Sequence, residues 1–251
     1  MTPCEIAQQR IAKNKATQTD WLDLGDLALD ELPPELGELT HLRMLALGGP
    51  AIVEKDGRLV FAMNSSRPAS RLTNLEPLRY LTSLQSLDLS GCASLSDVGP
   101  LQGLISLQSL DLSACRGLTT LESLRHLTSL QSLSLGGCAS LSDVGPLQGL
   151  ISLQSLDLSN CDGLATVDLG DLPALQSLSL RYCRGLTTVD LGDLPALQSL
   201  KLSDCDGLTT VDLGDLASLQ SLDLRNCDGL TTLDLGDLPA LQSLDLSSCR
   251  G

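Results

Sequence analysis

The stretch Leu84–Cys92, with the sequence LQSLDLSGC, recurs along the chain with little change. Its first leucine reappears at steps of 23 and then 22 residues, at Leu107, Leu130, Leu153, Leu175, Leu197, Leu219 and Leu241. A fixed period of roughly 20–29 residues marks one repeated structural unit, and such units stack so that each coil packs only on its neighbours. The sequence therefore predicts a solenoid rather than a domain with one central core.

The repeat resembles the leucine-rich repeat, whose signature L-x-x-L-x-L-x-x-(N/C)-x-L it matches with cysteine in the asparagine place. The resemblance implies an α/β solenoid, a horseshoe with a parallel β-sheet on its concave face. We expect residues 19–251 to form about ten coils, preceded by a cap over residues 1–18. Aromatic side chains are 2% of the chain, which fits an interior built from stacked leucines.

The net charge of −15 disfavours two classes of partner. Nucleic acid and anionic membrane surfaces would both repel this chain. No apolar run reaches the length of a spanning helix, and the opening MTPCEIAQQRIAKNK lacks the apolar stretch of a signal peptide. We therefore expect a cytoplasmic protein that binds neither nucleic acid nor membrane.

Eight of the nine cysteines occupy one slot of the repeat, directly after the strand: Cys92, Cys115, Cys138, Cys161, Cys183, Cys205, Cys227 and Cys249. A small side chain fits at this turn, so we expect a ladder of buried, reduced thiols. The chain has no Cys-x-x-Cys pair and only two histidines, which argues against a metal site. The sequence predicts no metal and no cofactor.

Residues 4–16 carry a helical pattern, with Ile6, Ile11 and Ala12 expected on the buried face. We interpret this helix as the N-terminal cap of the solenoid. The helix, the LDL segment and the following ELPPELGELTHL resemble the first coils of bacterial intracellular leucine-rich-repeat proteins, including those fused to Roco-type GTPases. The chain lacks the phosphate-binding motif G-x-x-x-x-G-K-(S/T), so the resemblance does not make it a GTPase.

An insertion at about residues 48–71 interrupts the early coils, because 42 residues separate Leu42 from Leu84. Residues 51–61 are expected to form a β-hairpin around Asp56-Gly57, and the polar run 64–68 to return the chain to the solenoid. Insertions of this kind map to one face, often the binding face. The hairpin is either part of a binding surface or a packed flap.

The connections between strands change along the chain. The segment CASLSDVGPLQGLISLQSLDLS occupies residues 92–113 and again 138–159, and its S-D-V-x-P-L element resembles the linker of internalin-type bacterial repeats. From residue 161 a shorter linker takes over, in which Val189, Leu191 and Leu194 are the apolar positions. This spacing predicts a short extended segment on the convex side, and a flatter body toward the C-terminus.

The outward positions of the strands form columns, and the columns that vary mark the candidate binding site. Large side chains gather on three successive coils, at Arg181, Tyr182, Lys201, Asp204, Arg225 and Asn226. Tyr and Arg are enriched in binding hot spots. An alternative remains open, in which Arg181, Lys201 and Arg225 only neutralise neighbouring aspartates.

The linkers from residue 161 on also carry two columns of aspartate, at residues 168, 190, 212 and 234 and at residues 171, 193, 215 and 237. Calcium would relieve their repulsion, but a solvated acidic face is the simpler interpretation. Enzyme chemistry is not expected, because no serine or histidine stands in a catalytic motif. A cysteine hydrolase would need an exposed thiol of low pKa.

These patterns predict a non-enzymatic scaffold for protein–protein recognition that binds a polypeptide on its concave face. The alternative is a sensor or adaptor domain of a larger or multi-component bacterial signalling or defence effector. The last coil has no polar cap in the sequence, so a homodimer or a following domain is expected to cover it.

Overall fold

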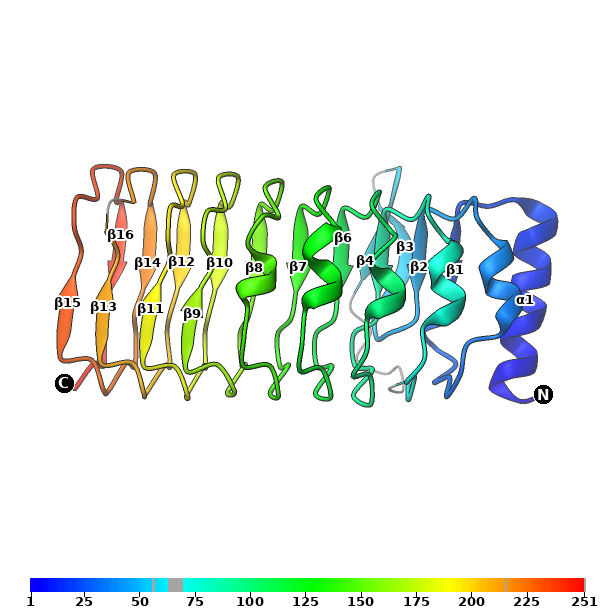
Figure 1. The fold of residues 1–251 in the computed structure, drawn as a ribbon, viewed down its shortest axis with the longest axis horizontal. Coiled ribbons are helices and arrows are strands. Elements are labelled where there is room, and N and C mark those ends of the chain that lie inside the picture. The colour runs from blue at the N-terminus through cyan, green and yellow to red at the C-terminus, as the bar shows by residue number, and fades with distance from the viewer. Residues whose placement is uncertain (56, 63–69, 215, 251) are drawn as a thin grey trace.

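The computed structural model describes residues 1–55, 57–62, 70–214 and 216–250, and shows the expected leucine-rich-repeat solenoid. Among these residues, ten short strands form one parallel sheet that runs the length of the molecule (Figure 1). They are β1 (Trp21–Asp23), β2 (Met44–Ala46), β5 (Ser86–Asp88), β6 (Ser109–Asp111), β7 (Ser132–Ser134), β8 (Ser155–Asp157), β10 (Ser177–Ser179), β12 (Ser199–Lys201), β14 (Ser221–Asp223) and β16 (Ser243–Asp245). The pairing joins equivalent residues, so Leu87, Leu110 and Leu133 are neighbours in the sheet.

The side of each coil away from this sheet changes along the chain, as the linker sequences predict. The first five such connections contain short 3-10 helices: η1 (Pro34–Glu38), η2 (Glu76–Tyr80), η3 (Gly99–Leu101), η4 (Glu122–His126) and η5 (Gly145–Leu147). The later ones pair into a second parallel sheet of β9 (Thr166–Asp168), β11 (Thr188–Asp190), β13 (Thr210–Asp212) and β15 (Thr232–Asp234). Figure 1 shows the helical turns giving way to strands.

The core lies between these two sides of the coils. It consists of leucines repeated in register, and Leu84, Leu87 and Leu89 are each fully buried. The ladder cysteines from Cys92 to Cys227 are fully buried beside them, whereas Cys249 is partly exposed and Cys4 is exposed. The leucines of the last coil are less covered, with Leu244 and Leu246 each 40% exposed.

The N-terminal cap is α1 (Pro3–Thr17), which begins with Thr2 and Glu5 in a reciprocal capping box. Its buried residues are Ala7, Ile11 and Asn14, and Ile6 is partly buried against the same core. The expected face is therefore confirmed for Ile6 and Ile11 and wrong for Ala12, which is exposed. Hydrophobicity alone missed Asn14, because it is a polar side chain that binds the sheet edge.

Two side chains of α1 reach the free edge of β1. Asn14 Nδ2 donates to Trp21 O at 2.8 Å, and an Arg10 guanidinium nitrogen donates to Asp23 O at 2.9 Å. His41 Nε2 lies 2.9 Å from Asn14 Oδ1 on the other side of the same amide. The helix thus provides partners for edge carbonyl groups that a further strand would otherwise bind.

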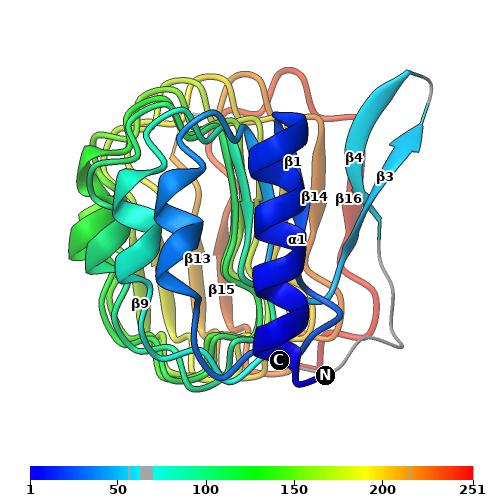
Figure 2. The same ribbon diagram turned by 90° about the vertical axis from the view of Figure 1, so that its right-hand side faces the viewer.

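The insertion forms the predicted hairpin of β3 (Ala51–Lys55) and β4 (Arg58–Ala62), paired antiparallel. Figure 2 shows it standing away from the coils on the side of the ten-stranded sheet. Gly57 has a φ of 73°, as the predicted turn requires. Asp56 and the polar run 64–68 lie outside the described residues.

Candidate functional site

The last residues of the strands form one variable column of the ten-stranded sheet, and most of them help to end the strand. In six coils its residue is an aspartate whose Oδ1 accepts the backbone N–H two positions later, at 2.8 to 3.2 Å: Asp23, Asp88, Asp111, Asp157, Asp223 and Asp245. In two other coils the residue is a serine that hydrogen-bonds a serine of the preceding coil. Ser134 pairs with Ser113 at 2.6 Å, and Ser179 pairs with Ser159 at 2.8 Å. Lys201 cannot replace the aspartate, because its ammonium group accepts no hydrogen bond, and the preceding coil offers it Arg181 in place of a serine.

The column at the exit of the strand holds a left-handed backbone in every coil from Gly91 on. Its φ values run from 55° to 77°, at Gly91, Ala114, Gly137, Asn160, Tyr182, Asp204, Asn226 and Ser248. Glycine, asparagine and aspartate adopt this region most readily, so the backbone accounts for Asp204 and Asn226. Asn226 Nδ2 also donates to Asp204 Oδ1 at 2.9 Å. Tyr182 has no such conformational reason to be there.

Arg225 pairs with aspartates, as the alternative interpretation predicts. Its guanidinium binds both carboxylate oxygens of Asp223, at 2.9 and 3.0 Å, and lies 3.5 Å from Asp245. Partial burial opposes ionisation of Asp223, but the hydrogen bonds and charge of Arg225 outweigh it and hold the pKa of that carboxyl below its ordinary value.

Arg181, Tyr182 and Lys201 behave differently, and we call these three residues the basic–aromatic patch. Arg181 Nε donates to Ser203 Oγ at 3.0 Å, and its guanidinium carbon lies 5.3 Å from the centre of the Tyr182 ring. The ring is 37% exposed. Lys201 is exposed on β12, next to Ser179 and Asp223 in the register, and forms no ion pair within the described part of the chain.

The structure thus brings all six predicted residues together on the coils of β10, β12 and β14, but gives them different surroundings. Asp204, Arg225 and Asn226 are occupied with one another or with neighbouring aspartates. The left-handed column was missed in the sequence. Its content of glycine, asparagine and aspartate was the signal that could have revealed it.

A buried carboxylate anchors the insertion where it leaves the sheet. Asp88 is fully buried, and its Oδ2 accepts the Gly48 N–H at 3.0 Å. A Cβ at Gly48 would lie 2.4 Å from Ser90 O, so only glycine allows this approach. Burial raises the pKa of Asp88 to about 6. At the end of the insertion, the buried Ser70 hydroxyl donates to Leu47 O at 2.8 Å.

The ladder thiols hydrogen-bond from coil to coil. The Sγ atoms of Cys115, Cys138, Cys161, Cys183, Cys205, Cys227 and Cys249 donate to a leucine carbonyl of the preceding coil at 3.0 to 3.4 Å. Burial raises the pKa of the Cys92 and Cys138 thiols to about 12 and that of Cys183 and Cys227 to about 11. These thiols therefore lack the thiolate character that a cysteine hydrolase needs.

The first aspartate column of the later linkers is also used by the fold. Asp168, Asp190, Asp212 and Asp234 each accept the N–H of a glycine two residues on, at 3.0 to 3.2 Å. Across the described residues, no three His, Cys, Asp or Glu side chains are grouped in a way that could hold a metal ion. No helix in that part of the chain is long and apolar enough to cross a membrane.

Part of the sequence matches a known repeat family. The family model for leucine-rich repeats in two copies matches residues 82–126. None of the curated proteins matches the sequence.

Several solved structures resemble the solenoid. The leucine-rich repeat domain of the type III effector XopL is 25% identical, covers 96% of this chain and 80% of its own, and gives a TM-score of 0.64. The functional domain of InlJ from Listeria monocytogenes, which includes a cysteine ladder, is 21% identical over 94% of this chain and 55% of its own, with a TM-score of 0.50. Toll from Drosophila, in its complex with Spatzle, is 20% identical over 85% of this chain and 32% of its own, with a TM-score of 0.55. The last two likenesses concern the fold alone.

Proposed function

Since this chain is a leucine-rich-repeat protein similar to bacterial ones, we propose that it binds a polypeptide partner on the face of its ten-stranded sheet. The leucine-rich-repeat fold supports a protein-interaction scaffold in general. The specific proposal is that Arg181, Tyr182 and Lys201 contact the partner. Asp204, Arg225 and Asn226 form the rim of the contact, where Asn226 bonds to Asp204 and Arg225 to Asp223.

One observation carries this proposal: on two adjacent coils the chain gives up residues that favour its own fold. Tyr182, the one large side chain of its column, takes a left-handed backbone at φ 61°, where three other coils have asparagine or aspartate, two have glycine, one has alanine and one has serine. Lys201 replaces the aspartate or serine that hydrogen-bonds at the strand end in the coils from β5 on. Departures from local preference that cost stability are expected where a protein binds something.

The chemistry of the patch favours a partner that carries carboxylate groups. Arg181 and Lys201 form a basic area on a chain with a net charge of −15, and Tyr182 adds a partly exposed aromatic ring beside Arg181. An acidic side chain would meet both cations, and an apolar one beside it would cover the ring. We infer a cytoplasmic location as well, which the nine free cysteines support.

A selection experiment tests the proposal. Short random peptides are displayed and selected on the wild-type chain, and counter-selected on a Tyr182→Asn, Lys201→Ser variant. Both replacements are residues that other coils use at these positions, so the variant keeps the fold. We expect peptides with aspartate or glutamate beside an apolar residue to be enriched on the wild type only. Equal enrichment on the variant would place the binding surface elsewhere.

A further inference from the structure

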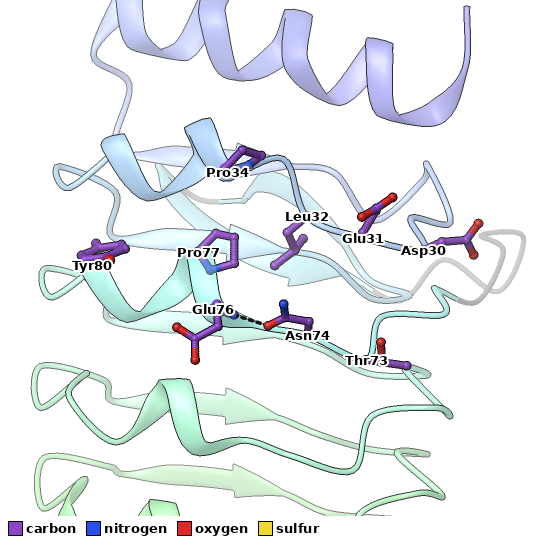
Figure 3. A pocket seen from close by; sticks show the side chains of 9 residues that line it. All are labelled: Asp30, Glu31, Leu32, Pro34, Thr73, Asn74, Glu76, Pro77 and Tyr80. Atoms are coloured by element: carbon purple, nitrogen blue, oxygen red, sulfur yellow. Dashed lines mark hydrogen bonds between the residues drawn. The ribbon is translucent and has the colours of Figure 1, made fainter.

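A pocket of about 550 Å³ lies in the first coils of the solenoid, between η1 and η2 and several coils away from the basic–aromatic patch. Figure 3 shows Asp30 and Glu31 at one end, Tyr80 at the other, and Leu32 and Pro77 between them. The middle of the pocket is apolar, because Leu32, Pro34 and Pro77 line it. Pockets that combine an apolar floor with a few polar groups are the usual form of a ligand site.

Glu31 accepts no hydrogen bond and forms no ion pair within the described residues. In the next four coils, the side chain directly before the N-cap of the 3-10 helix accepts the N–H two residues later: Asn74, Asp97, Thr120 and Asp143 accept at 2.8, 2.7, 3.4 and 2.8 Å. In the first coil this place is taken by Leu32, and the residue two positions later is Pro34, which has no N–H, so the turn needs no carboxylate. The Glu31 carboxylate is exposed at the pocket, beside that of Asp30.

Tyr80 is presented to solvent at the far end of the pocket. Its ring is 59% exposed and packs on Gly37, where a Cβ would lie 3.0 Å from a ring carbon. The neighbouring Arg79 pairs with Glu76 at 2.9 Å and lies 5.9 Å from the centre of the ring. Glu76 is thus neutralised, so the unpaired charge of the described lining comes from Asp30 and Glu31.

We propose that this pocket binds a peptide segment in which a basic side chain is followed by apolar ones. The basic group lies against Asp30 and Glu31, where it forms charge-assisted hydrogen bonds. The apolar residues cover Leu32 and Pro77 and end against the Tyr80 ring. This site is separate from the sheet face and does not depend on the function proposed for it.

The test uses the full ¹⁵N-labelled chain and the acetylated, amidated peptide Arg-Leu-Pro-Leu. We expect amide resonances of Glu31, Asn74 and Tyr80 to shift on titration. The peptide with citrulline in place of arginine has the same shape without the charge, and it should bind at least about fivefold more weakly. Asp30→Asn with Glu31→Gln should weaken binding of the arginine peptide to a similar extent, at an unchanged melting temperature.

The matched control is Glu35→Gln, which removes an exposed carboxylate of the nearby η1 that does not line the pocket. This variant should bind the arginine peptide as the wild type does. The proposal is overturned if the citrulline peptide binds equally well, or if the Glu35 variant loses as much affinity as the double variant. Shifts confined to other coils, or no shifts at millimolar peptide, would overturn it too.

Discussion

Tyr182 shows how single residues in this chain can be compared with their equivalents in other coils. The left-handed backbone at its position costs an ordinary side chain about 1–2 kcal/mol, and less for asparagine. Asn160 in the preceding coil and Asn226 two coils further on take the same conformation, with φ values of 60° and 55°. Most of the column follows this preference, apart from the small side chains of Ala114 and Ser248, and Tyr182 is its one large side chain.

Replacing Tyr182 by asparagine should leave the fold intact. The relief of backbone strain, about 1 kcal/mol, is offset in part by the lost contact between Arg181 and the ring, about 0.5 kcal/mol. We expect the free energy of unfolding to stay equal or to rise by up to about 1 kcal/mol, measured by urea denaturation. A loss above about 1 kcal/mol would mean that the ring serves the fold rather than a partner.

Asp88 should make stability depend on pH in the range between its unfolded and folded pKa values. Burial raises its pKa from 3.8 to about 6, so the folded state binds the proton more readily than the unfolded chain does. Protonation between pH 6 and pH 4 then stabilises the folded state. Above pH 6 the buried charge costs up to about 3 kcal/mol.

The measurement compares the wild type with Asp88→Ser, the residue of the equivalent place in two other coils, at pH 7 and pH 5. The wild type should gain stability relative to the variant as the pH falls. If the two proteins keep the same difference in unfolding free energy at both pH values, Asp88 does not carry a buried charge.

At the scale of elements, the cap helix and the hairpin show which structural features the sequence predicts and which it does not. The hairpin was predictable because Asp56-Gly57 gives a local turn signal and the apolar residues flank it directly. The helix was predictable, but only part of its buried face, because Asn14 is only 4% exposed and faces the sheet edge. A polar side chain that binds backbone carbonyls is invisible to a search for apolar periodicity.

Asn14→Ala should destabilise the N-terminal coils. The change removes the donors for Thr19 O and Trp21 O, which lie 3.0 and 2.8 Å from Asn14 Nδ2. Buried carbonyl groups left without partners cost about 1–3 kcal/mol. The emission of Trp21, the one tryptophan of the chain, should report unfolding of this edge at lower denaturant than the far-ultraviolet circular dichroism of the whole solenoid.

Lys13→Ala is the control for this change, because Lys13 lies on the exposed side of the same helix. It should alter stability by less than about 0.5 kcal/mol. A loss of stability equal to that of Asn14→Ala would show that the helix contributes only general surface contacts.

At the scale of the whole molecule, the repeat period determined most of what could be known in advance. Steps of 22 and 23 residues placed the strands of the ten-stranded sheet from β5 on, the leucine core of these coils and the cysteine ladder, because coils of equal length must stack in register. The candidate site was found where the copies disagree. Which of its residues serve the fold, and which are free to contact a partner, followed only from φ values and hydrogen bonds. The spacing of residues in the sequence does not contain this information.

The cysteine ladder allows a test of the solenoid as a whole. Native protein treated with a maleimide should label quickly at Cys4, slowly at the partly exposed Cys249, and not at the buried ladder. Mass spectrometry after proteolysis would identify the labelled peptides, and labelling in urea gives the positive control. Rapid labelling of Cys138 or Cys161 in native protein would contradict a continuous, closed stack of coils.

The affinity of one selected acidic peptide for the wild type and for Tyr182→Asn tests the central claim most directly. Calorimetric titration should give a dissociation constant at least about tenfold higher for the variant, since an aromatic hot-spot residue contributes about 2 kcal/mol. The affinity of the wild type should fall with added salt, because Arg181 and Lys201 attract the carboxylates. Equal affinities for the two proteins would contradict the assignment of the basic–aromatic patch as the binding surface.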